Sequence, residues 1–104
     1  MAQIDDIISK VTTLTDRQKI QWTAVGTTGF RPEIDNLHIA ISRDTSGSPF
    51  YNFTVYGEDA QILEQSGDYG MDSLHGHLYE LARRNALKVD DNLKRLSQRL
   101  DELI

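Results

Sequence analysis

The architecture follows from residues 36–57, which read NLHIAISRDTSGSPFYNFTVYG. Residues 36–43 and 50–57 both alternate between apolar and polar side chains, which is the pattern of half-buried β-strands. Between them, residues 44–49 (Asp-Thr-Ser-Gly-Ser-Pro) form a turn-favouring cluster. The stretch therefore predicts an antiparallel hairpin. Its apolar face comprises Leu37, Ile39, Ile41, Tyr51, Phe53 and Val55.

The segments on either side of this hairpin extend the predicted sheet. Residues 19–25 alternate, with Ile20, Trp22 and Ala24 expected to point inward. Residues 30–35 contain Pro32, which cannot donate to a ladder, and so predict an edge strand or an extended loop. Residues 60–65 predict a short further strand, and residues 66–71 a polar loop.

Helical periodicity marks the two ends of the chain. Apolar residues in 3–14 recur at helical spacing, with two aspartates in the first turn. Residues 73–85 predict a second helix with Asp72 as its N-cap, and a third helix follows with Asp90 as its cap. In the third helix, apolar residues are spaced 4, 3, 4 and 3, as in a helix seam. That seam comprises Val89, Leu93, Leu96, Leu100 and Leu103.

The order of these elements predicts one α+β domain over residues 1–104. It has an N-terminal helix, a three- to four-stranded antiparallel sheet, and two C-terminal helices packed on one sheet face. The seam is about two heptads long, too short for an autonomous coiled coil. We expect it to pack on the chain's own sheet, with a shared dimer seam as the alternative.

Composition narrows the classes of function. The 104 residues carry a net charge of −5 and no cysteine, which excludes disulfides and thiolate zinc sites.

The charge is unevenly distributed along the chain. Residues 1–79 hold eleven acidic and five basic side chains, whereas residues 80–104 hold five acidic and six basic ones. Nucleic-acid binding needs a concentrated positive field, so we expect no nucleic-acid partner. An acidic body attracts a basic partner instead. The alternative is binding through six basic residues in 83–99.

The N-terminus and the apolar runs of the chain bear on targeting and membrane insertion. The N-terminus lacks the basic and apolar regions of a signal peptide, and no apolar run reaches membrane-spanning length. We therefore expect a cytoplasmic protein without a membrane contact.

Motifs with a chemical meaning have simpler structural explanations. His75 and His77 lie two apart, which on a helix directs them to different sides, so we expect no metal site. We expect one of them at the core edge and the other in solvent. Residues 44–47 resemble the aspartic-protease signature, but the glycine comes one residue late, and a turn explains them. Residues 26–29 lead into Phe30-Arg31-Pro32 and not into a helix, so a phosphate cradle is not expected. No cofactor is predicted.

Two sets of residues remain as candidate sites. Tyr69 and Met71 lie in the predicted polar loop, where no periodicity requires burial, and join the helix seam as candidate contact residues. The outward face of the hairpin offers a candidate polar pocket of His38, Ser42, Asn52 and Tyr56.

The function predicted from the sequence is a non-enzymatic protein-interaction module, forming a homodimer. Its role would be that of an adaptor, an inhibitor or an immunity-type protein that masks a basic partner. The alternative is a small-molecule binder or minor enzyme that uses the polar face around His38.

Overall fold

A computed structural model describes residues 3–44, 47 and 49–104. Within these residues, five strands form one antiparallel meander in sequence order. The turn predicted over residues 44–49 lies partly outside the described residues. The elements are α1 (Ile4–Asp16), β1 (Trp22–Val25), β2 (Gly29–Pro32), β3 (Ile39–Asp44), β4 (Phe50–Tyr56), β5 (Ile62–Tyr69), α2 (Leu74–Ala86) and α3 (Val89–Leu103).

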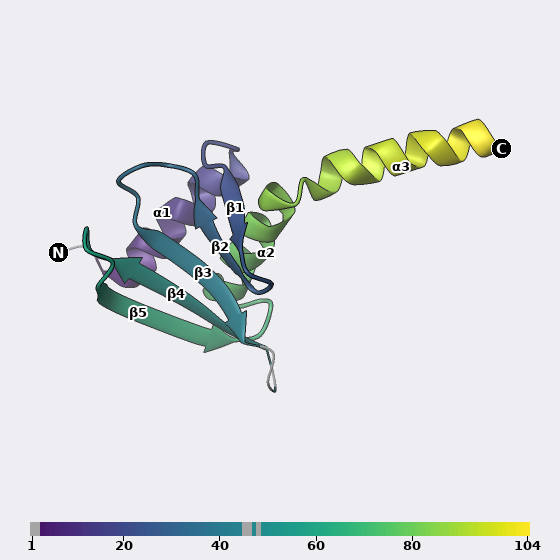
Figure 1. Ribbon diagram of the computed structural model, residues 1–104. Coiled ribbons are helices and arrows are strands. Elements are labelled where there is room, and N and C mark those ends of the chain that lie inside the picture. Colours follow the sequence, from purple (N-terminus) through teal and green to yellow (C-terminus); the bar gives the residue numbers. More distant parts are fainter. Residues whose placement is uncertain (1–2, 45–46, 48) are drawn as a thin grey trace.

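The core lies between the sheet and two helices. α2 contacts all five strands, and α1 packs beside α2 on the same side of the sheet (Figure 1). The fully buried side chains include Ile41 and Phe53, which lie opposite each other in the β3–β4 register. The buried apolar residues are Ile8, Val11, Ile20, Trp22, Phe30, Ile39, Ile41, Tyr51, Phe53, Leu78, Tyr79 and Ala82. The hairpin prediction and the α+β class are therefore confirmed.

The sheet has more strands than the three or four predicted. Residues 29–32 form β2, an inner strand between β1 and β3, so the prediction of an edge strand or loop is wrong there. Pro32 is tolerated because β2 pairs with β3 only at Gly29 and Phe30, and no ladder bond needs its missing N–H. Ala24, predicted to point inward, is exposed near the end of β1.

The last strand is also longer than predicted. β5 pairs with β4 up to Tyr69, so most of the predicted loop 66–71 is strand. The sequence hides this extension because an exposed edge strand needs no apolar alternation. Gly67, an apparent breaker, lies under the ring of Phe50, and a Cβ added at this position would clash with that ring.

Both predicted caps of the C-terminal helices are one or two residues away from the observed ones. Ser73, and not Asp72, caps α2: its Oγ accepts a hydrogen bond from the Gly76 N–H at 3.0 Å. The N-cap of α3 is Lys88, whose carbonyl accepts the Asn92 N–H at 3.0 Å. Asp90 lies in the first turn, where the helix dipole stabilises its negative charge.

The two C-terminal helices differ in how they join the body. α2 packs on the sheet as predicted, whereas α3 contacts α2 and extends away from the body (Figure 1). All residues of α3 are described, and none is buried. The expectation that the Val89–Leu103 seam packs on the chain's own sheet is therefore wrong. None of the described helices has the length and apolarity that a bilayer span requires.

Candidate functional site

The base of α3 fixes the direction of that helix. Lys88 adopts a left-handed backbone conformation (φ 52°), which interrupts the helical backbone between α2 and α3. Two contacts then tie the first turn of α3 to the end of α2. Asn92 Nδ2 donates to the Leu87 carbonyl at 2.9 Å, and Arg84 forms an ion pair with Asp90.

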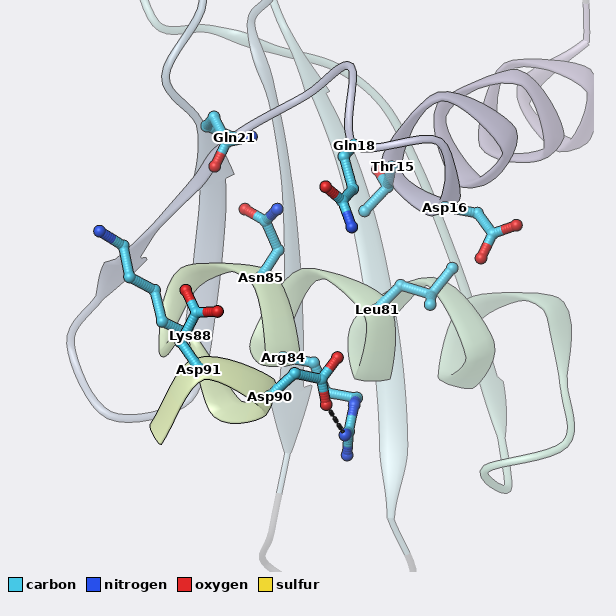
Figure 2. A pocket seen from close by; sticks show the side chains of 10 residues that line it. All are labelled: Thr15, Asp16, Gln18, Gln21, Leu81, Arg84, Asn85, Lys88, Asp90 and Asp91. Carbon is cyan, nitrogen blue, oxygen red and sulfur yellow. Dashed lines mark hydrogen bonds and ion pairs between the residues drawn. The ribbon is translucent and has the colours of Figure 1, made fainter. Parts of the chain in front are cut away.

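A polar notch of about 370 Å³ lies at this joint, between the ends of α1 and α2 and the start of α3 (Figure 2). Acidic, amide and basic side chains line the notch, and the Arg84–Asp90 ion pair lies along one side of it. Asn85 accepts a hydrogen bond from the Trp22 backbone N–H at 2.7 Å, which fastens β1 to α2. These contacts explain the notch as a structural joint. Its lining is Thr15, Asp16, Gln18, Gln21, Leu81, Arg84, Asn85, Lys88, Asp90 and Asp91.

The predicted seam forms an exposed apolar stripe on α3. Leu93, Leu96 and Leu100 are each more than half exposed, and Leu103 is 83% exposed, whereas Val89 at the base is partly buried. Fifteen residues of helix give the stripe a length of about 22 Å. We call Leu93, Leu96, Leu100 and Leu103 the leucine face.

The polar side of α3 mixes both signs of charge. Each of its basic residues has an acid three or four positions away, such as Asp91 for Arg95 and Glu102 for Arg99. Of the three basic residues that precede this helix, Arg83 and Arg84 pair with Glu80 and Asp90, and Lys88 lies three positions before Asp91. The basic residues of 83–99 therefore do not form an uninterrupted positive stripe, which a nucleic-acid interface would need.

The predicted polar pocket lies on the sheet face that α1 and α2 leave open. Ser42 lies directly opposite Asn52, and the Tyr56 N–H donates to the His38 carbonyl at 2.8 Å. The strands therefore bring the four residues together as two cross-strand pairs, with Ala40 and Thr54 between the pairs.

An open concavity of about 1010 Å³ covers part of this face. His38, Ser42 and Tyr56 line it, and Asn52 does not. Its side wall is the connection over residues 33–38, which sequence reasoning missed as a functional element. Ile34 and Leu37 gave a weak signal, since both are apolar residues in a segment that follows Pro32.

The two other predicted contact residues are exposed but lie far from α3. Tyr69 ends β5, where its ring packs against Phe50 with centroids 4.8 Å apart, and Met71 follows in the turn before α2. This corner adjoins the start of α2, whereas α3 joins its end, about 18 Å away along the helix. The predicted contact residues therefore belong to two separate surfaces.

The histidine pair is divided between the core and the solvent. His75 is buried, and its Nε2 lies 2.9 Å from Ser66 Oγ, while His77 is exposed. The predicted division, with one histidine at the core edge and one in solvent, is confirmed. In the part of the chain that the structure describes, no group of three or more potential ligands gathers around a metal position.

Comparison with known proteins adds no further constraint. No family model, no curated protein and no solved structure matches the chain. The functional argument therefore depends on the surfaces just described: the leucine face, the open sheet concavity and the Tyr69 corner.

Proposed function

We propose that this protein is a non-enzymatic protein-interaction module that forms a homodimer through the leucine face of α3. One observation carries the proposal: a fifteen-residue amphipathic helix projects from the body with its apolar stripe exposed. Isolated helices of about 12–15 residues are marginal in water and gain their stability from packing. A partner surface on the leucine face would supply that packing.

The spacing of the stripe supports a second copy as that partner. Residues spaced 4 and 3 apart occupy the a and d positions of a heptad, which interdigitate with the same positions of an identical helix. In an antiparallel pair, Arg99 would face Arg99 of the other copy at a flanking position. A parallel pair avoids this repulsion. With only two heptads, the dimer should dissociate on dilution.

Within the candidate polar pocket of the open sheet face, the serine and the histidine lie too far apart to act as a catalytic pair. A nucleophile and its base must come within about 3 Å of each other. His38 and Ser42 lie four residues apart in an extended segment, which separates them by about 13 Å. Ser42 is paired instead with Asn52, which provides no general base.

Light scattering after size exclusion tests the dimer, over a wide range of protein concentration. Wild-type protein should have twice the chain mass at high concentration, and Leu96→Glu should have the mass of one chain. Gln98→Glu is the matched control, because it adds the same charge on the opposite side of α3. The proposal fails if the wild type is monomeric throughout, or if Leu96→Glu dimerises as well as Gln98→Glu does.

A second candidate function, the binding of a small molecule, rests on the open concavity. Its lining includes polar side chains from separate places along the chain, among them His38, Ser42 and Tyr56, and such a lining can orient a ligand. Amide chemical shifts recorded with a library of aromatic and carboxylate fragments would test it. Shifts at His38, Ser42 and Tyr56 that vanish in Tyr56→Ala support this function. Their absence, or shifts elsewhere, removes it.

A further inference from the structure

β5 is an edge strand that exposes its backbone. Among the described residues it pairs with β4 alone, and seven of its eight residues are exposed. The Gly70 N–H donates to the Pro49 carbonyl at 3.2 Å, so the neighbouring Phe50–Tyr69 pair is not hydrogen-bonded across the strands. Alternation along the ladder then directs the backbone groups of Gln65, Gly67 and Tyr69 outward.

Two of these outward donors are occupied by side chains of β5 itself. The Gln65 N–H donates to Glu64 Oε1 at 3.1 Å, and the Tyr69 N–H donates to Asp68 Oδ1 at 2.8 Å. Both bonds are local and exposed to water. An incoming strand can therefore replace each carboxylate with a backbone carbonyl, provided that it also gives the displaced carboxylate a cation.

The opposite edge of the sheet is closed in a different way. β1 has only four residues, and the Trp22 N–H donates to Asn85 Oδ1 on α2. A strand arriving there would have to displace a side chain fixed in the body of the protein. β5 is thus the edge that another chain can reach.

β5 and the sequence on either side of it carry only acidic charged residues. No Lys or Arg occurs between Arg43 and Arg83. Glu64 and Asp68 lie opposite Val55 and Tyr51, and so share one face of the sheet, while Tyr69 lies on the other. The carboxylates of the 44–80 region are Asp44, Glu58, Asp59, Glu64, Asp68, Asp72 and Glu80.

The negative charge of β5 indicates which kind of strand can pair with its free edge. A second copy pairing through its own β5 would place four carboxylates on one face of the seam, and like charges across strands are destabilising. A strand with cations at two positions four apart would meet Glu64 and Asp68 together. Apolar residues between the cations would fall on the other face, beside Tyr69.

We propose that the β5 edge is the docking site for a basic extended segment of another protein, which adds to the sheet as a sixth strand. The segment carries Lys or Arg at two positions four apart and apolar side chains at the alternate positions. Its carbonyls accept the N–H groups of Gln65 and Tyr69, while Glu64 and Asp68 turn to its cations. This surface is separate from α3, and its occupation does not depend on the dimer.

The test uses the full-length protein and a fluorescent peptide with the sequence Thr-Val-Lys-Val-Thr-Val-Lys-Val-Thr. Fluorescence anisotropy should show saturable binding of this peptide. A peptide with Glu in place of both Lys should not bind. A third peptide keeps every side chain but is N-methylated at alternate residues on its ladder edge, and it should lose most of the affinity.

Matched protein variants separate this site from general attraction of charge. Glu64→Gln with Asp68→Asn should weaken binding about tenfold, because two charge-assisted contacts are lost. Asp101→Asn with Glu102→Gln removes the same charge on α3 and should change binding by less than about twofold, since screening limits distant charges. Leu96→Glu should leave peptide binding unchanged, which distinguishes failure of this proposal from failure of the dimer.

Three results would overturn the proposal. The first is no binding of the Lys peptide. The second is equal binding of the N-methylated peptide, which would mean that no ladder forms. The third is an equal loss of affinity in both charge variants, which would mean that the peptide is attracted by net charge and not by the β5 edge.

Discussion

α2 and α3 are consecutive amphipathic helices of similar length, yet the body of the protein covers only one of them. α2 buries Leu78 and Ala82 completely between the sheet and α1. α3 leaves its leucine face exposed and projects from the end of α2 (Figure 1). An amphipathic pattern therefore predicts that a face will be buried, but it does not identify the surface that buries it.

The composition of the two faces explains the difference. α2 presents side chains of very different size, including Gly76, Leu78, Tyr79 and Ala82, which fit an uneven sheet surface. α3 presents leucines at regular spacing, which suits another regular helix. The left-handed backbone conformation of Lys88 then changes the direction of the chain, so that α3 does not lie on the sheet beside α2.

The largest expected effect comes from the same truncation made in each helix. Leu78→Ala should lower the free energy of unfolding by about 2–5 kcal/mol, because it leaves a cavity in the core. Leu96→Ala should lower it by less than about 0.5 kcal/mol in dilute monomer, as expected of an exposed site. Urea denaturation at low protein concentration measures both. Equal costs would show that α3 is packed within the chain.

A smaller effect should follow from Gly76→Ala at the start of α2. In an ordinary helix interior this change stabilises by about 1 kcal/mol. Here the added Cβ would clash with the Gly70 carbonyl oxygen and lie 2.9 Å from Met71 Cα, both backbone atoms. We expect a loss of about 1–3 kcal/mol in urea denaturation, as for overpacking. A gain would mean that α2 does not approach the 70–71 turn so closely.

The joint between the helices gives the next prediction. Lys88→Gly should stabilise the protein by about 0.5–1 kcal/mol, because glycine adopts the left-handed conformation without a steric cost. Thermal unfolding measures the gain. The control is Arg95→Gly within α3, which places glycine in a right-handed helix and should reduce the helical circular dichroism signal. A loss of stability in Lys88→Gly would contradict the conformation of the joint.

The smallest effect concerns the Glu80–Arg83 ion pair on α2. The hydrogen bond from Arg83 lowers the pKa of the Glu80 carboxyl below its ordinary value of 4.5. Its contribution to stability is therefore complete above pH 4.5 and is lost as the pH falls through the lowered pKa. Both side chains are about one-third exposed, so the contribution is about a few tenths of a kcal/mol. Glu80→Gln should flatten the acid limb of the stability curve by this amount, and an unchanged limb would contradict it.

Much of the fold was accessible from the sequence because burial imposes periodicity. The alternation of Ile39 and Ile41 with polar residues predicted β3, and that of Tyr51 and Phe53 predicted β4. β2 and the end of β5 escaped prediction for opposite reasons. Pro32 suggests an edge where the chain is internal, and β5, exposed at seven of its eight residues, has no buried face to impose a pattern.

The candidate surfaces were predictable in part. Strand alternation placed His38 and Tyr56 on one face, where the structure pairs them. The seam on α3 was recognised, but its partner was not, since heptad spacing is the same for a helix packed on its own sheet and for a helix packed on another copy. The hydrogen bonds from the β5 backbone to Glu64 and Asp68 were not predictable, because they form only where β5 is an edge strand. Which strand lies at an edge depends on how the whole chain packs.

The most direct test of the central claim is amide hydrogen exchange along α2 and α3, measured at low and at high protein concentration. Amides of α2 should be slow at both concentrations, because its face is buried within the chain. Amides of α3 should exchange rapidly at low concentration and become protected at high concentration, when a second copy covers the leucine face. If α3 exchanges at the same rate at both concentrations, the leucine face is not a self-association surface.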